Sequence, residues 1–224
     1  MSLGTLGLVN GTGLASNYTL VGGTRLASIT PATLTIAAGS ASKVYDGDTL
    51  ADVTLDSFTG LVGSETVTAA GPVAGTFNSK NVAEATLVTL GSVTLADGSN
   101  GGLASNYSFA NGQTLAGTIT AKALTATANA SDKVYDGNTT AIATLTNLTG
   151  LLGSETLGAT GTATFNSKDV ADANLVTINS TTLTDGANGG LASNYSLAGG
   201  QVATAHITPK ALTVVGADGV GQGL

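Results

Sequence analysis

A lysine, a tyrosine and an aspartate stand close together in this chain, and the same motif occurs twice. The motif Lys-Val-Tyr-Asp-Gly occupies residues 43–47 and returns at residues 133–137. Tyr and Lys can act as general acid and base, with Asp to orient them. A catalytic site also needs a pocket of convergent groups, and a motif given to every unit of an array usually serves folding. We therefore expect a turn at Asp-Gly, no enzyme activity, and no catalytic or cofactor-binding residues.

Acidic and amide side chains at three turns could offer oxygen ligands to Ca²⁺. They form the pairs Asp46 with Asp48, Asp97 with Asn100, and Asp185 with Asn188. None of these pairs has the spacing of a known calcium loop. Asp and Asn are also expected in turns, because their side chains hydrogen-bond to nearby backbone. The sequence therefore predicts no metal site and no cofactor, with Ca²⁺ as the alternative.

The remaining reactive side chains give weaker signals. A Lys–Asn isopeptide crosslink promoted by a buried glutamate, Glu65 or Glu155, is conceivable, but no spacing demands it. His206 stands where the first copy has Thr118, so it is not a ligand shared by the copies. The chain has no cysteine, no Gly-rich phosphate loop between a strand and a helix, and no base partner for its serines.

These motifs belong to a block of about ninety residues that occurs twice, which indicates a tandem array. Phe-Asn-Ser-Lys at residues 77–80 returns at 165–168, and Leu-Ala-Ser-Asn-Tyr occurs three times, ending at Tyr18, Tyr107 and Tyr195. We divide the chain into 1–30, the tail of an earlier copy, the full copies 31–120 and 121–208, and 209–224, the start of a later copy.

Each copy is patterned as short strands between turns. Thr alternates with Leu and Ile in residues 32–37, a period typical of a strand with one buried face. Further strands are predicted at residues 49–55, 65–70, 75–77, 87–95, 107–110 and 115–120, with Asp-Gly and Asn-Gly turns between them. The pattern predicts an all-β fold of tandem antiparallel β-sandwich (Ig-like) modules. A small β-grasp-like or mixed module is the alternative, if residues 80–85 form a helix.

The boundary between the copies has no flexible linker. Residues 118–125 pass from the last strand of one copy into the first strand of the next without a Gly/Ser spacer. We therefore expect the modules to be held stiffly end to end as a rod, each with the neighbouring repeats as partners. The tyrosines and phenylalanines lie at repeat-equivalent positions and should anchor the cores, since large side chains gain most from burial. Asn-Tyr before a strand also resembles a tyrosine corner, in which the hydroxyl bonds to backbone.

The composition excludes several classes of partner. A net charge of −7 with only seven basic residues argues against nucleic acid and against anionic membrane surfaces. No uncharged stretch is apolar enough to span a membrane, so we expect no membrane insertion, and a monomeric fragment. Charged residues make up only 9% of the chain, so the polar surface must come from Thr, Ser, Asn and Gly. No signal peptide is visible and Met1 lies inside a repeat, so we expect an expression start there.

The chain resembles the YDG-type repeat in three stretches, at residues 133–140, 165–170 and 207–213. Such repeats occur in arrays within very large secreted bacterial proteins, including filamentous-haemagglutinin-like adhesins exported by two-partner secretion. The resemblance implies an extracellular or cell-surface location and a stalk that projects an adhesive tip, and it supplies no catalytic residues. Ala121 stands where Pro31 and Pro209 occur, so one junction lacks the φ restraint of proline.

Two functions follow as expectations. The first is a structural spacer in a bacterial cell-surface adhesin. The alternative is a multivalent array that binds a surface glycan or matrix polymer and contributes to adhesion or biofilm, since weak sites gain from multiplicity. The segment Asn-Gly-Gly-Leu-Ala-Ser-Asn-Tyr, identical at residues 100–107 and 188–195, is the candidate binding patch.

Overall fold

The computed structural model of the protein describes residues 7–19 and 27–214. The parts of the predicted flanking copies at residues 1–6, 20–26 and 215–224 lie outside the described residues. The described part is all-β, as predicted, with no α-helix and therefore none that could cross a membrane. Its helical turns are three short 3-10 segments: η1 (Ala15–Asn17), η2 (Ala104–Asn106) and η3 (Ala192–Asn194).

The first full copy forms a small closed barrel. Its strands are β1 (Ala32–Val44), β2 (Leu50–Thr59), β3 (Val67–Ala69), β4 (Val73–Phe77), β5 (Leu87–Leu90), β6 (Leu95–Asp97), β7 (Tyr107–Phe109) and β8 (Thr114–Thr120). Five of them make a ring in the order β1-β2-β4-β5-β8, which closes because β8 pairs with β1. The strand β7 adds to the first part of β1, and β3 with β6 makes a separate ribbon.

This ring corrects the prediction of an antiparallel sandwich. Both β7 and β8 run parallel to β1, one beside each half of that long strand. A sandwich would leave the edges of its two sheets open, whereas this ring has none. The interior is filled, since a Cβ on Gly75 or Gly117 would lie 2.5 or 2.7 Å from a Val88 methyl group. These glycines let the strands curl tightly around Val88.

The second copy repeats this topology with more interruptions. Its strands are β9 (Lys122–Ala130), β10 (Lys133–Val134), β11 (Thr140–Ala141), β12 (Ala143–Thr149), β13 (Leu157–Phe165), β14 (Leu175–Asp185), β15 (Tyr195–Leu197), β16 (Val202–Thr204) and β17 (Ile207–Thr208). The pairs β9/β10, β11/β12 and β16/β17 take the places of β1, β2 and β8, and β10 and β17 are again parallel. The barrel is therefore a property of the repeat.

Two extra residues explain the main difference between the copies. In the second copy β13 and β14 pair from Leu157 to Phe165, with one register shift between Thr162 and Ala163. The first copy contains Gly71, at φ +90°, followed by Pro72, and its ladder is divided into β4–β5 and β3–β6. Proline cannot donate to a ladder, so the strand ends there. Residues 80–85 form a turn, with Ala85 N donating to Asn81 O (2.9 Å), and not the helix of the alternative prediction.

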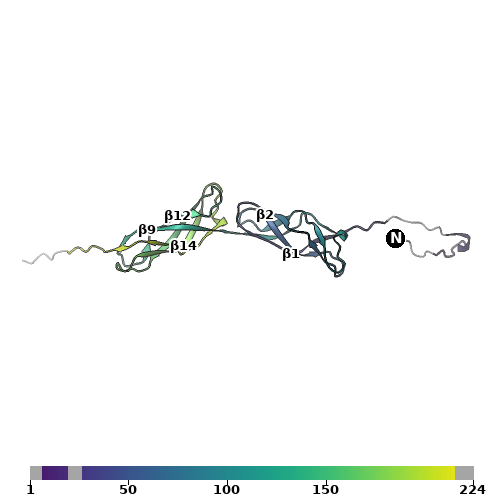
Figure 1. The fold of residues 1–224 in the computed structure, drawn as a ribbon, viewed down its shortest axis with the longest axis horizontal. Helices are drawn as coiled ribbons and strands as arrows, with labels where there is room; N and C mark the ends of the chain where they lie inside the picture. Colours follow the sequence, from purple (N-terminus) through teal and green to yellow (C-terminus); the bar gives the residue numbers. More distant parts are fainter. Residues whose placement is uncertain (1–6, 20–26, 215–224) are drawn as a thin grey trace, which may run out of the picture.

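The buried side chains join the two barrels. Tyr45, Phe77 and Phe165 are buried, as the aromatic pattern predicted, whereas Tyr18 is 68% exposed. One apolar cluster runs from Tyr45 in the first copy to Tyr195 in the second. Figure 1 shows the two barrels one after the other along the long axis, connected where β8 passes into β9.

Candidate functional site

The joint between the two barrels is short and is flanked by buried residues. Only Ala121 separates the end of β8 from the start of β9. On either side of it, Ile119 is 3% and Leu124 is 5% exposed, so each strand is anchored in its own core right up to the joint. The absence of a spacer, predicted from the sequence, therefore places the end of one barrel directly against the next.

Two tyrosines and a glutamate form the centre of the joint. Tyr45 from the first copy and Tyr195 from the second pack edge to face, with ring centroids 5.3 Å apart. The Tyr45 hydroxyl donates to Glu155 Oε1 (2.9 Å), and the Tyr195 hydroxyl donates to Glu155 Oε2 (2.5 Å). The Tyr195 oxygen also accepts from Leu152 N (3.0 Å). One carboxylate thus receives a hydroxyl from each barrel, and hydrogen bonds to an ionised group are stronger than neutral ones.

Asn194 adds a second polar link beside the tyrosines. Its side chain is fully buried, and Oδ1 accepts from Val82 N (2.9 Å) while Nδ2 donates to Asn81 Oδ1 (3.1 Å). Val82 N lies in the turn after β4, so its backbone donor is satisfied by the neighbouring barrel. Burying a polar side chain is costly without such partners. Asn194 therefore fixes the rotation of one barrel against the other.

The Asp-Gly turn of the first copy also touches the second copy. Gly47 has φ +87°, which favours glycine. A Cβ at this position would lie 3.2 Å from Leu152 Cδ1, so Leu152 packs against the bare backbone of the turn. We call Tyr45, Gly47, Asn81 and Val82 the knob face, and we call Leu152, Glu155, Asn194 and Tyr195 the socket face.

Two residues of the socket face, Asn194 and Tyr195, belong to residues 188–195, the segment that is identical to residues 100–107. In the first copy Asp97 Oδ1 accepts from Ala104 N (2.7 Å), and Asn100, at φ +56°, donates from Nδ2 to Ser64 O (2.9 Å). A Cβ on Gly102 would lie 1.9 Å from Thr66 O, so only glycine fits there. These contacts hold the Asn-Tyr pair at the end of the barrel, and their equivalents recur in the second copy.

The lysine of the repeated motif faces its own barrel. Lys43 Nζ lies 2.7 Å from Asp46 Oδ1 and 2.5 Å from Asp48 Oδ1, and 5.9 Å from the centre of the Phe77 ring. The tyrosine of the same motif points into the joint instead. The structure therefore separates the lysine and tyrosine that could have formed an acid–base pair, and it brings the lysine together with the two aspartates.

The other side chains that were weighed as metal ligands also make local contacts. Asp97 accepts a hydrogen bond from Ala104 N, and Asp185 accepts one from Ala192 N. The backbone N–H of His206 donates to Asp132 Oδ1 (2.7 Å), a contact between neighbouring strand ends. Among residues 7–19 and 27–214 no three His, Cys, Asp or Glu side chains gather as metal ligands would. The three Asp/Asn pairs proposed as alternative Ca²⁺ ligands are thus engaged in turns.

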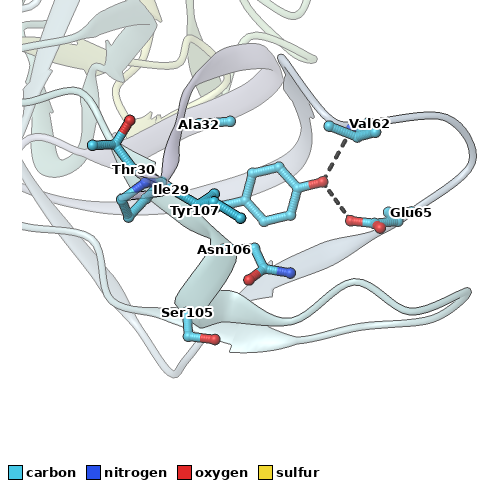
Figure 2. A pocket seen from close by; sticks show the side chains of 9 residues that line it. Ile29, Thr30, Ala32, Val62, Glu65, Ser105, Asn106 and Tyr107 are labelled. Carbon is cyan, nitrogen blue, oxygen red and sulfur yellow. Dashed lines mark hydrogen bonds between the residues drawn. The ribbon is translucent and has the colours of Figure 1, made fainter. Parts of the chain in front are cut away.

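The barrel ends that face away from the joint carry residues equivalent to those of the joint. Each of these ends has the equivalent of one of its two contact faces. At the start of the first copy, the Tyr107 hydroxyl donates to Glu65 Oε2 (2.5 Å) and accepts from Val62 N (3.1 Å), as Figure 2 shows. A pocket of about 480 Å³ opens beside them. Asn106 is exposed here, whereas its equivalent Asn194 is buried. This end presents a socket face, and within residues 7–19 and 27–214 no knob face lies against it.

The far end of the second copy carries the other half. The Tyr135 N–H donates to Thr208 O (2.9 Å), as the Tyr45 N–H does to Thr120 O (2.9 Å), so the backbone holds both tyrosines alike. Tyr135 is only half-buried, while Tyr45 is 2% exposed. This end presents a knob face, and no socket face covers it in the part of the chain that the structure describes.

Alkaline pH should weaken the joint. Burial and the hydrogen bond to Glu155 raise the pKa of Tyr195 from 10.0 to about 12, and the pKa of Tyr45 is raised for the same reasons. A raised pKa in the fold stabilises it fully below the unfolded value, and the stabilisation is lost as pH rises from about 10 to about 12. We expect Tm to fall over this window and to fall less steeply for Tyr195→Phe. Tyr18→Phe, at an exposed tyrosine, is the control, and equal slopes for all three proteins would contradict this origin.

The sequence pointed to the aromatic positions but not to their partners. For Glu155 the sequence suggests only a crosslink, and for Asn194 it suggests a binding patch or a place in a tyrosine corner. The usable signal was that Glu65 and Glu155, together with Asn-Tyr, are the same in both copies although each copy has few charged residues. In both copies the tyrosine hydroxyl donates to the glutamate, and in the second copy these residues also contact the first barrel.

Comparison with known protein families finds one family whose model matches this chain. The model of the YDG domain matches residues 30–115 and again residues 120–205, one match for each barrel. Searches among curated proteins and among solved structures give no match. The two matches cover most of the chain, and their order reproduces the tandem arrangement of the barrels. The chain therefore belongs to the YDG domain family, of which it contains two consecutive copies.

Proposed function

We propose that this chain is a spacer segment of a secreted bacterial surface adhesin, in which successive repeats give length. The observation that carries the proposal is the joint. A one-residue connection, the edge-to-face tyrosines and the buried Asn194 leave the barrels little freedom to hinge. Such a joint transmits direction from one repeat to the next, as a stalk that holds a binding tip away from a cell requires.

The surface composition supports the same role. Exposed strand positions are mostly Thr, Ser, Asn and Gly, and charged residues are only 9% of the chain. Neutral polar groups keep an extended protein hydrated without strong attraction between distant repeats. The absence of cysteine from the sequence fits export of an unfolded chain, because no disulfide has to form first.

The alternative function is a multivalent glycan-binding array, and the identity of two segments supports it less than the sequence alone suggests. The identical segments 100–107 and 188–195 were its candidate patch, but at the joint the Asn-Tyr pair of the second segment is buried against the first barrel. Identity between the copies is explained by the contact between repeats. A glycan site would have to use the exposed sides of the barrels.

Small-angle X-ray scattering on the whole chain tests the spacer. A compact protein of this length has a radius of gyration of about 17 Å, and we expect a clearly larger value with the pair-distance profile of a rod. A variant with Gly-Ser-Gly-Ser inserted after Thr120 should give a broader, shorter profile, because the barrels can then bend. A compact wild type, or a wild type as flexible as the insertion variant, would contradict the proposal. Binding to a glycan array by the wild type would favour the alternative.

A further inference from the structure

We infer that Asn111 is a site of spontaneous deamidation, a covalent modification open to the first copy of the repeat and closed to the second. The inference comes from the local structure around the three Asn-Gly pairs of the two full copies, at residues 100–101, 111–112 and 188–189. It does not depend on the function proposed above, because it concerns the chemistry of a single turn.

The reaction converts an asparagine amide into a carboxylate. The backbone nitrogen of the following glycine attacks Cγ of the asparagine and closes a succinimide ring, and the amide nitrogen leaves as ammonia with the proton of the glycine nitrogen. Water then opens the ring at either carbonyl. One product is aspartate, and the other is isoaspartate, in which the main chain continues through the side-chain carboxyl group. Glycine favours the attack because it has no Cβ to hinder the approach, and the asparagine side chain must be able to turn toward the glycine nitrogen.

Two of the three asparagines are held in another position. Asn100, at φ +56°, donates from Nδ2 to Ser64 O (2.9 Å), and Asn188, at φ +57°, donates from Nδ2 to Ser154 O (2.9 Å). The loops around both residues are closed by backbone hydrogen bonds. Either side chain must first give up its hydrogen bond and rotate inside a closed loop before the ring can form.

Asn111 has none of these restraints. It is exposed in the turn between β7 and β8, and none of residues 7–19 and 27–214 hydrogen-bonds to its side chain or to the Gly112 N–H. A Cβ on Gly112, which has φ +71°, would meet nothing within 4 Å, so the space beside the attacking nitrogen is open. The turn is held at its next residue instead, since Gln113 Nε2 donates to Ala110 O (2.9 Å). The Asn111 side chain can therefore rotate toward the Gly112 nitrogen while the strands stay in place.

The same turn of the second copy cannot react. Gly199 and Gly200 stand where the first copy has Asn111 and Gly112, so the turn contains no amide side chain. Its second glycine is also engaged, because the Gly200 N–H donates to Ile178 O (2.7 Å). Deamidation at this turn would therefore make two similar barrels chemically different.

Isoaspartate at residue 111 should loosen the attachment of β7 to β1. The main chain of isoaspartate is longer by one carbon atom, so the turn no longer fits its anchors on either side. Gln113 Oε1 accepts from Ile36 N (2.6 Å), and Gln113 Nε2 donates to Leu34 O (3.3 Å). At the other side of the turn, Ala110 N donates to Leu34 O (3.1 Å). Aspartate leaves the main chain unchanged, so the isoaspartate form and not the new charge should weaken these contacts.

Peptide mapping by mass spectrometry tests the inference. The native chain is incubated at mildly alkaline pH, which promotes loss of the proton from the glycine nitrogen, and the conversion of each pair is followed over time. Digestion after aromatic residues separates Asn100 from Asn111, since Tyr107 and Phe109 lie between them. A side-chain hydrogen bond of ordinary strength slows a reaction that must break it by a factor of about two to ten. We expect Asn111 to convert faster than Asn100 and Asn188 by at least this factor.

Incubation in denaturant is the control for the effect of the fold. Without the fold no side chain is restrained, and the three conversion rates should come together. Native conversion of Asn100 or Asn188 as fast as that of Asn111 would overturn the inference. An Asn111 that converts in denaturant but stays intact in the native chain would also overturn it.

Two variants test the consequence for β7. Asn111→Gln forms the corresponding ring much more slowly, so this variant should keep its Tm during an incubation in which the wild type loses part of its own. Freshly prepared Asn111→Asp should melt like fresh wild type, because it carries the charge on an unchanged main chain. An aged wild type that contains isoaspartate at residue 111 and keeps its full Tm would show that the turn does not hold β7.

Discussion

Replacing Tyr45 by alanine should separate the two barrels into independently unfolding units. The substitution removes a buried ring from the continuous core, its edge-to-face contact with Tyr195 and its hydrogen bond to Glu155. Loss of a large buried aromatic side chain costs about 3–5 kcal/mol. Chemical denaturation should therefore show a lower midpoint, with two resolved transitions if the wild type unfolds in one.

The chain supplies a matched control at Tyr135, the same position in the second copy. Its backbone is held by the same hydrogen bond to the last strand, but no barrel covers its ring. Tyr135→Ala should lower stability less and should leave the coupling between the barrels intact. If the two substitutions cost the same, Tyr45 acts only within its own barrel and the joint contributes little.

Replacing Asn194 by alanine should be the most damaging polar substitution at the joint. Val82 N and Asn81 Oδ1 would lose their partner inside a closed contact, and an unsatisfied buried group costs about 1–3 kcal/mol. Asn106→Ala removes the equivalent side chain at the solvent-exposed end and should change stability by no more than about 0.5 kcal/mol, as surface substitutions do.

Amide hydrogen exchange reports on the hydrogen bond of a single residue, which a global free energy of unfolding cannot do. The Val82 N–H should exchange faster in Asn194→Ala than in the wild type, since its acceptor is gone and water can enter. Exchange of amides inside the ring, such as Phe77 N–H, which donates to Thr49 O (2.8 Å), should change much less. A Val82 amide that stays as protected as in the wild type would mean that another group accepts its hydrogen bond.

The strands of this protein could be predicted from local pattern, and their assembly could not. Alternation in residues 32–37 predicts β1, and the lack of a Gly/Ser spacer at 118–125 predicts the direct passage from β8 to β9. Closure of the ring depends on parallel pairing of β1 with β8, a contact between the two ends of a copy that no local period records. A series of short strands with tight turns fits a sandwich equally well.

Only part of the site could be predicted from the sequence, for a related reason. Tyr45 and Tyr195 were expected as core anchors, and both are buried. Their contact with each other could not be predicted, because it depends on the rotation of one barrel against the next. Glu155 lacked a recognisable role since its partners come from residues 45 and 195. Residues shared by the two copies indicate which positions matter. Only the three-dimensional structure shows which of these side chains contact each other.

The one-residue connection also prevents a wrong pairing of strands during folding. The first strand of each repeat keeps one edge unpaired until the last strand of that repeat is available, and an unpaired edge accepts foreign strands. In a row of near-identical repeats the nearest wrong partner for β8 is β9, the strand that follows it. A hairpin between consecutive strands needs a loop of at least about two residues, and Ala121 is alone. The short joint thus forbids the most accessible mispairing, and each repeat is directed to close on itself.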